Sequence, residues 1–222
     1  MTPPGVLFSA GLDSAVLLTE ACAQHGAAHP LYVSAGLAWE SAERATAEQF
    51  VARLAQQTAV APLVTLALDM RDVYPSTHWA IRGEAPAYDT PDEDVYLEGR
   101  NIVLLSKAAV YAVRAGISSL WLGPLAGNPF PDATPPFFAA MAQALSLGLD
   151  TPIAIETPFL ALDKSDVIKR GETLRVPWEL TLSCMQPVGG LHCGRCSKCR
   201  ERIDAFREAG VADTATFASA AR

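Results

Sequence analysis

The chain has 222 residues, of which 50% are hydrophobic and 18% charged, with a formal net charge of −7 and a pI near 5.1. This composition is typical of a folded domain and excludes an intrinsically disordered chain. The acidic balance argues against a broad nucleic-acid-binding surface, which requires clustered Lys and Arg. Nucleic acid is therefore not expected as a partner, and a small molecule is.

Targeting signals are not expected. No apolar run reaches the ~18–20 residues that a membrane helix requires, and the first five residues lack the basic and apolar regions of a secretory signal. The five cysteines are then expected in a reducing compartment, where clustered cysteines more often bind metal than form disulfides. The expected location is the cytoplasm, with no membrane partner.

Short apolar runs alternate with helix-length segments along the chain. Strands are expected at residues 6–8, 31–33, 63–68, 120–122 and 153–155. Helices are expected after the first strand, with Val16, Leu17, Ala21 and Cys22 facing inward, and at residues 40–57, 101–114 and 136–147. This alternation predicts an α/β fold with a parallel sheet and helices on both faces. Residues 1–175 are expected to form this domain, and residues 176–222 a small helical segment packed on it.

Two long segments interrupt the alternation. Residues 71–95 contain three prolines and an acidic run, and residues 123–136 contain five prolines. Segments of this length are functional covers or disordered. For the first segment, a plain surface excursion is an equal alternative. The second follows a strand end, where open α/β sheets bind ligands, and is expected to contribute to a site.

A candidate nucleotide site lies between the first strand and the first helix. It consists of Phe8, Ser9, Ala10, Gly11, Leu12, Asp13 and Ser14. Gly11 is expected to supply backbone angles that let N–H groups converge on an anion, at the positive end of the helix dipole. Ser9 and Ser14 add hydroxyl donors, and Asp13 can hold the Mg²⁺ of a nucleotide. The alternative is an ordinary glycine turn with an Asp or Ser cap. The P-loop lysine and a G-x-G-x-x-G motif are both missing, which argues against a kinase, a GTPase or a dinucleotide fold.

This loop closely resembles the S-G-G-x-D-S pyrophosphate loop of the N-type ATP pyrophosphatases, which cleave ATP between the α- and β-phosphates. Ala10 stands where that family usually has glycine. If the position requires a positive φ, alanine costs about 1 kcal/mol there.

Four of the five cysteines form a cluster near the end of the chain, with the spacing Cys184-x8-Cys193-x2-Cys196-x2-Cys199. Four thiolates complete a tetrahedral shell around Zn²⁺ with no open position, which is typical of a structural site. Gly189, Gly190 and Gly194 are expected to ease the turns between them. An iron–sulfur cluster also takes four thiolates and remains the alternative metal. Cys22 is expected to be a core residue.

The loop and the cysteine cluster together resemble the 7-cyano-7-deazaguanine synthase family. The matching stretches are residues 6–14, 99–101, 130–132, 144–148, 156–159, 163–164 and 182–184, followed by the spaced cysteines. They keep their order along nearly the whole chain. The resemblance implies an adenine nucleotide α-hydrolase-like, Rossmann-like fold with ATP, Mg²⁺ and Zn²⁺, and members of the family are commonly homodimers.

The resemblance also implies a reaction and residues to perform it. ATP adenylates the carboxylate of 7-carboxy-7-deazaguanine, ammonia displaces AMP to give an amide, and a second ATP drives dehydration to the nitrile. The candidate catalytic residues of this carbon–nitrogen ligase are Ser9, Asp13, Ser14, Arg100 and Lys164.

Arg100 suits bidentate binding of a carboxylate or phosphate, and Lys164, at an expected helix start, suits the α-phosphate or the pyrophosphate. Asn101 and Asp132, with Glu98, are candidates for binding the purine-like ring. The alternatives are surface ion pairs for Arg100 and Lys164, a helix cap for Asn101 and a turn for Asp132.

Residues 35–40, Glu98 and the short proline-rich loop depart from the family pattern. A related enzyme that adenylates or amidates another carboxylate, and a tRNA-modifying thiolase, are therefore alternative functions. A non-catalytic zinc-ribbon module on a degenerate nucleotide fold is a third.

Overall fold

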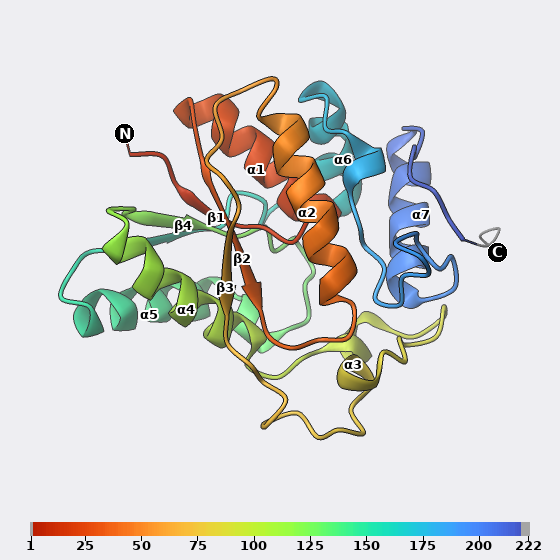
Figure 1. Cartoon of the computed structure of the whole chain (residues 1–222), viewed down its shortest axis with the longest axis horizontal. Helices are drawn as coiled ribbons and strands as arrows, with labels where there is room; N and C mark the ends of the chain where they lie inside the picture. The colour runs from red at the N-terminus through yellow and green to blue at the C-terminus, as the bar shows by residue number, and fades with distance from the viewer. Residues whose placement is uncertain (1, 219–222) are drawn as a thin grey trace.

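Five parallel strands form one sheet in the computed structural model, which describes residues 2–218 (Figure 1). The strands are β1 (Gly5–Leu7), β2 (His29–Ser34), β3 (Val64–Ala67), β4 (Ser119–Trp121) and β5 (Ala154–Glu156). Their order is β3-β2-β1-β4-β5, and Val6 of β1 pairs with Pro30 of β2 on one side and Trp121 of β4 on the other. The direction of winding therefore reverses between β1 and β4, and the carboxyl end of β1 is where such a sheet binds its ligand.

Helices cover both faces of this sheet (Figure 1). The α-helices are α1 (Leu12–His25), α2 (Glu40–Leu54), α3 (Trp79–Arg82), α4 (Arg100–Arg114), α5 (Pro135–Gly148), α6 (Lys164–Thr173) and α7 (Ser197–Ala209). Short 3₁₀ turns are η1 (Asp92–Val95), η2 (Pro131–Ala133) and η3 (Trp178–Leu180). Helices α1, α2 and α6 share one core with β1, and α4 and α5 share another with β2 and β4.

The helices form where their apolar residues recur with helical spacing. In α4, Leu105, Ala108, Ala109 and Ala112 are buried and recur every three or four residues, so one stripe of the helix faces the sheet. In α1, every residue from 15 to 22 is buried because the helix lies between the sheet and α6. A helix buried on most sides needs apolar residues all around, and Cys22 is one of them, at 1% exposure.

The predicted α/β fold with helices on both faces is confirmed. Each predicted strand is present with bounds shifted by one or two residues, and the segments predicted at 40–57, 101–114 and 136–147 are helical. Residues 71–95 are not structureless, since they contain α3 and η1. Within residues 2–218, no helix is long and apolar enough to cross a membrane.

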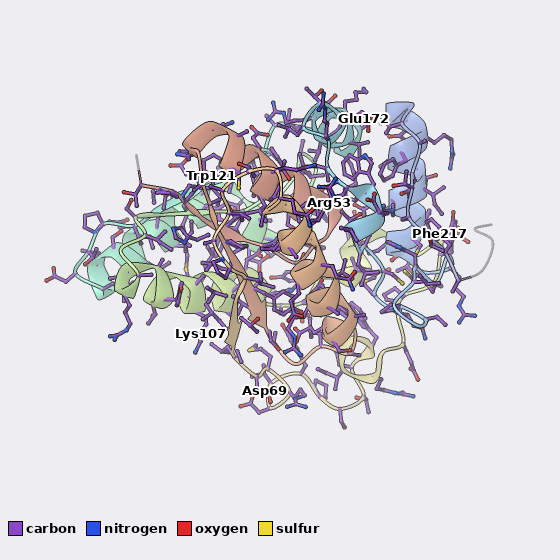
Figure 2. All side chains as sticks on the ribbon, turned by 45° about the horizontal axis from the view of Figure 1, so that its top comes forward. Arg53, Asp69, Lys107, Trp121, Glu172 and Phe217 are labelled. Atoms are coloured by element: carbon purple, nitrogen blue, oxygen red, sulfur yellow. The ribbon has the colours of Figure 1, made fainter. Side chains whose placement is uncertain are left out.

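The C-terminal segment packs on the same sheet domain through contacts between α6 and α7. Its anchor is Arg202, which is 1% exposed and whose guanidinium donates to Asp213 at 2.7 Å and to Thr181 Oγ1 at 2.8 Å. Phe217, labelled in Figure 2, lies beside His192 with the ring centroids 5.1 Å apart. A buried Arg with both charge and hydrogen-bond partners holds the chain on either side of α7 in place.

Candidate functional site

A cavity of about 290 Å³ opens at the carboxyl ends of β1 and β2. On one side it is lined by Ser9, Gly11, Asp13 and Ser14. We call residues 8–14 the phosphate loop, after the family motif that they resemble. On the other side it is lined by Arg100 and Asn101 at the start of α4, and by Asp132 of η2. The proline-rich segment 123–136 contributes Gly123, Pro124, Asn128 and Phe130 as well. The segment expected to contribute to a site thus lies in the wall of this cavity.

The backbone of the phosphate loop differs from the prediction at one position. Gly11 has a φ of −65°, which any residue can adopt, whereas Ala10 has a φ of 59°. The carbonyl of Ala10 accepts a hydrogen bond from the N–H of Leu182 at 2.8 Å, and α1 begins two residues later. The role assigned to Gly11 is therefore wrong, and the left-handed turn comes from Ala10.

The two serines face each other across the loop. Ser9 Oγ lies 3.4 Å from Ser14 Oγ, and Ser14 Oγ donates to the carbonyl of Gly11 at 3.1 Å. The N–H of Gly11 points to Ser9 Oγ at 3.4 Å. Since α1 begins at Leu12, the first N–H groups of this helix have no intrahelical partner and are directed out of its amino end. The loop thus gathers backbone and hydroxyl donors at one point of the cavity, as an anion site requires.

Asp13 and Lys164 form an ion pair at the edge of this loop. Lys164 is the first residue of α6, as predicted, and its Nζ lies 3.3 Å from Asp13 Oδ2. Burial raises the pKa of the Asp13 carboxyl, and Lys164 acts in the opposite direction. The other oxygen, Asp13 Oδ1, is buried and has no hydrogen-bond partner among the described residues. An oxygen in that position fits a ligand of Mg²⁺.

Arg100 lies on the cavity wall at the start of α4. Its Nε is buried and without a hydrogen-bond partner among residues 2–218. Glu43 also lies on the cavity wall, is 9% exposed and accepts a hydrogen bond from Tyr32 at 2.9 Å. Burial raises the pKa of Glu43 to about 7, although Arg100 and Tyr32 lower it. An unpartnered guanidinium in a half-enclosed cavity is suited to bind an anionic oxygen.

Asn101 and Asp132 bind each other. The backbone N–H of Asn101 donates to Asp132 Oδ2 at 2.9 Å, and its side-chain amide donates to the carbonyl of Asp132 at 2.8 Å. Asp132 therefore satisfies a free N–H in the first turn of α4, where a carboxylate also meets the positive end of the helix dipole. Both residues line the cavity. Glu98 does not: Leu97 lines the cavity and the next side chain, Glu98, is exposed.

Residues 35–40, which depart from the family pattern, lie outside the cavity wall. Trp39 is 6% exposed and stacks on Trp79 with the ring centroids 5.7 Å apart. Glu40 accepts hydrogen bonds from Ser34 Oγ at 2.6 Å and from the backbone N–H of Ala35 at 2.7 Å. This stretch therefore builds the turn between β2 and α2. One turn further along α2, Glu43 reaches the cavity.

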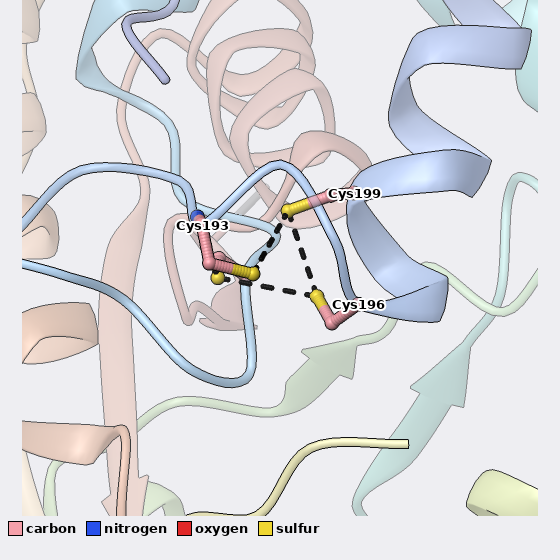
Figure 3. Close-up of side chains that lie close together, drawn as sticks. Cys193, Cys196 and Cys199 are labelled. Carbon is pink, nitrogen blue, oxygen red and sulfur yellow. Dashed lines mark hydrogen bonds between the residues drawn. The ribbon is translucent and has the colours of Figure 1, made fainter. Parts of the chain in front are cut away.

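The four clustered cysteines converge as predicted. All four are buried, and their sulfur atoms lie within 4.8 Å of one another. Figure 3 shows Cys196 and Cys199 at the start of α7 and Cys193 on the loop before it. Gly189, Gly190 and Gly194 have φ values of 59°, 83° and 74°, which confirms their role in the turns.

The spacing of the sulfur atoms fits one Zn²⁺. The separations are 3.9 Å for Cys184–Cys196, 3.9 Å for Cys193–Cys199 and 3.5 Å for Cys196–Cys199. Four sulfurs about 2.3 Å from a central ion at tetrahedral angles lie about 3.8 Å apart. An iron–sulfur cluster carries its thiolates on separate irons and spreads them more widely. Backbone N–H groups of Gln186 and Cys193 point at Cys184 Sγ, both at 3.3 Å, which stabilises thiolate charge.

Sequence reasoning missed Tyr32, Glu43 and Glu201. The first two lie on the cavity wall, and Glu201 hydrogen-bonds Lys164. Glu43 and Glu201 sit in helices rich in charged residues, where a carboxylate is usually solvated. Their burial comes from partners far away in the chain, so local spacing carried no signal of it.

A parallel sheet with a cavity at its switch point and a separate cluster of four cysteines that could hold a metal ion defines a Rossmann-like α/β protein. The family model described as Queuosine biosynthesis protein QueC matches residues 5–210. The chain belongs to this family.

Relatives of similar length support this membership. The 7-cyano-7-deazaguanine synthase of Syntrophotalea carbinolica is 32% identical over 226 residues, covering 96% of this chain and 95% of that protein. The protein of the same name from Anaeromyxobacter dehalogenans is 34% identical, covering 96% and 94%. The one from Thermoplasma volcanium is 39% identical over a shorter stretch, 59% of this chain and 58% of that protein. The NMN synthetase of Francisella tularensis has a TM-score of 0.40 and 17% identity, covering 95% and 73%, a likeness too weak to carry information on function.

Proposed function

We propose that the chain is an ATP-dependent ligase that converts 7-carboxy-7-deazaguanine and ammonia to 7-cyano-7-deazaguanine. As a member of the QueC family, it functions in queuosine biosynthesis, the process in the family's description. The observation that carries the proposed reaction is the meeting of a phosphate loop and an unpartnered Arg100 in one cavity. An acyl adenylate forms only where a phosphate and a carboxylate are held together.

The phosphates of ATP are proposed to lie at the phosphate loop. Ser9, Ser14 and the free N–H groups of α1 donate to them, and Lys164 neutralises charge on the departing pyrophosphate. Asp13, with its buried unpartnered oxygen, would hold Mg²⁺. A bound Mg²⁺ neutralises phosphate charge and orients the phosphates.

The acceptor is proposed to lie at the opposite end of the cavity. Arg100 binds the substrate carboxylate and keeps one of its oxygens near the α-phosphate. Tyr96 and Phe130 stack with the ring centroids 5.0 Å apart and line the cavity together with Phe138, which gives a planar heterocycle an apolar wall. Asp132 and Asn101 hold η2 against α4 and keep their remaining oxygens for polar contacts with the ring.

In the proposed reaction, each bond that forms is matched by a bond that breaks. A carboxylate oxygen attacks the α-phosphorus, and pyrophosphate leaves. Ammonia adds to the acyl carbon, AMP leaves with the former carboxylate oxygen, and a proton is lost to give the amide. The amide oxygen then attacks the α-phosphorus of a second ATP, and pyrophosphate leaves. This oxygen departs with AMP as the C–N triple bond forms and two protons are lost from the nitrogen. Exclusion of water protects the acyl adenylate in between.

The test is to incubate zinc-replete protein with ATP, Mg²⁺, ammonium and 7-carboxy-7-deazaguanine and to follow AMP release and nitrile by chromatography. We expect both products, and neither when the carboxylate is omitted. AMP release with other carboxylates but not with this one would favour a ligase with another acceptor. Absence of AMP with every acceptor would contradict the assignment to ATP-driven ligation.

We also infer a homodimer in the cytoplasm. Helix α5 carries no charged residue, and Leu147 on it is 76% exposed. On the neighbouring α4, Val110 and Ile102 are 49% and 47% exposed, so an apolar surface faces outward where a second copy can bind. The convergence of four cysteines on one possible metal site agrees with a reducing compartment. Light scattering is expected to give the mass of a dimer, and that of a monomer for Leu147→Glu.

A further inference from the structure

Lys164 is held between carboxylates from two different parts of the fold. Its Nζ lies 3.3 Å from Asp13 Oδ2 of the phosphate loop and also donates to Glu201 Oε1 of α7. The second oxygen of Glu201 accepts a hydrogen bond from Lys198 Nζ at 2.5 Å. The three side chains of Lys164, Glu201 and Lys198 are between 21% and 27% exposed, so solvent screens this network only partly.

The position of Glu201 follows from the cysteine cluster. Helix α7 begins at Ser197, immediately after Cys196, and Cys199 lies in its first turn. Lys198 and Glu201 are three residues apart on that same helix, a spacing that brings two side chains together on one face. Wherever the thiolates hold the start of α7, they also hold the carboxylate that contacts Lys164.

Lys198 gives this network a second anchor. Its Nζ lies 3.9 Å from Asp92 Oδ1 in η1, and Arg200 lies 4.0 Å from the same oxygen. The backbone N–H of Ser197 donates to the carbonyl of Pro86 at 3.2 Å. The long segment 71–95 therefore packs on the start of α7 and limits the movement of Glu201.

The charges explain why a second carboxylate matters. With Asp13 alone, the lysine ammonium would sit directly over the carboxylate that we assign to Mg²⁺. Glu201 gives the ammonium a second carboxylate contact on the α7 side, so that Asp13 does not hold it alone. Lys198 neutralises Glu201 from the other side, so the pair of lysines and the pair of carboxylates balance before any phosphate binds.

We infer that Glu201 is a positioning residue for Lys164, through which the four-cysteine segment sets the geometry of the phosphate loop. This inference rests on the proposed ATP chemistry, in which Lys164 faces the pyrophosphate. The metal segment then has a part in ATP turnover as well as in folding. A continuous network of charged side chains connects the proposed nucleotide site to the cysteine cluster, and it consists of Asp13, Lys164, Glu201 and Lys198.

The test compares Glu201→Gln with Glu208→Gln, a change to an exposed carboxylate on the same helix. Zinc content and the thermal midpoint are measured first, then kcat and KM for ATP from pyrophosphate release. We expect Glu201→Gln to keep its zinc and to lose about tenfold in kcat, because the negative charge that holds the Lys164 ammonium is removed. Glu208→Gln is expected to match the parent protein in all four quantities.

A double-mutant cycle separates positioning from a general loss of structure. In a Lys164→Met background, the additional change Glu201→Gln is expected to have less than about a twofold effect on kcat, since its partner is gone. Three results would each overturn the inference. Glu201→Gln could have equal effects on kcat in both backgrounds, it could lose its zinc, or it could leave kcat unchanged. If Lys164→Met lowers kcat and Glu201→Gln does not, the proposed function stands and the positioning role fails. If the parent protein releases no AMP, the proposed function itself fails.

Discussion

The left-handed backbone conformation in the phosphate loop belongs to Ala10, with a φ of 59°, and not to its neighbour Gly11, with a φ of −65°. Ala10 is fully buried. A methyl group built on Gly11 would lie 3.4 Å from Ser9 Oγ and 4.0 Å from the Leu182 carbonyl oxygen, which is ordinary contact. The two adjacent small residues therefore differ in what they tolerate. A larger side chain at Ala10 is limited by the backbone angle and by the available volume, whereas one at Gly11 is limited by neither.

Larger side chains are accordingly expected to destabilise the protein much more at Ala10 than at Gly11. Ala10→Val should lower the free energy of unfolding by about 2–5 kcal/mol, from the left-handed angle of a β-branched residue together with overpacking. Gly11→Ala should lower it by less than about 1 kcal/mol, the scale of a helix-cap change. Denaturant unfolding of the zinc-replete proteins measures both. A larger loss for Gly11→Ala than for Ala10→Val would contradict the assignment of the left-handed turn.

Arg100 is expected to matter for turnover and little for stability. Its Nε has no hydrogen-bond partner among the described residues, so Arg100→Met breaks no such bond at that atom. We expect kcat/KM for the carboxylate substrate to fall by about 100-fold, the loss of a bidentate charged contact in a half-enclosed site. The matched control is Arg114→Met, at the exposed far end of the same helix, which should leave kcat/KM unchanged. Equal losses in the two variants would argue against a substrate contact for Arg100.

The sequence was sufficient for the features that depend on local order. The alternation of apolar strands and helices predicted the parallel sheet, and the cysteine spacing predicted the four sulfur atoms that converge within 4.8 Å. Lys164 was predicted at a helix start, and α6 begins there. In each case the prediction rests on a periodicity or a spacing of residues within one segment. Local steric preferences then determine the structure of that segment.

The remaining site features depend on contacts between distant segments. Lys164 and Glu201 are separated by 37 residues, and Asn101 and Asp132 by 31. Glu43 on α2 is buried against Tyr32 of β2 and faces the charge of Arg100 from α4, and no window of sequence contains these contacts. The carbonyl of Ala10 likewise meets a distant segment, since it accepts a hydrogen bond from the N–H of Leu182. These contacts between distant segments form only when the sheet brings the segments together.

Removal of the metal is expected to destabilise the whole domain. Zinc analysis should give one equivalent per chain, and Cys196→Ser should abolish it because three ligands cannot close a structural site. The thermal midpoint should fall by on the order of 10 °C, since binding to a structural site contributes directly to folding. Cys22→Ala, which changes the cysteine in the core of α1, should keep one equivalent of zinc. Two or more iron atoms per chain with visible absorbance would contradict the zinc assignment.

Glu43 is expected to make stability depend on pH near neutrality. Burial raises its pKa from 4.5 to about 7, with Arg100, Tyr32 and Trp39 acting to lower it and Glu40 to raise it. The folded protein therefore holds this proton up to a higher pH than the unfolded chain does. By linkage, the free energy of unfolding falls as pH rises through this window, by on the order of 3 kcal/mol from this one group.

Glu43→Gln cannot lose a proton, so its stability relative to the parent protein should increase steadily between pH 4.5 and about 7. Denaturant unfolding of both proteins at several pH values measures the difference. Glu48→Gln serves as the control on the same helix, since the Glu48 side chain is 62% exposed and its difference from the parent should vary far less with pH. Replacing Arg100 removes a charge that lowers the pKa of Glu43, so in Arg100→Met the loss of stability should extend to higher pH. A stability difference for Glu43→Gln that stays constant over this window would mean that Glu43 is ionised throughout, paired to Arg100 before any substrate arrives.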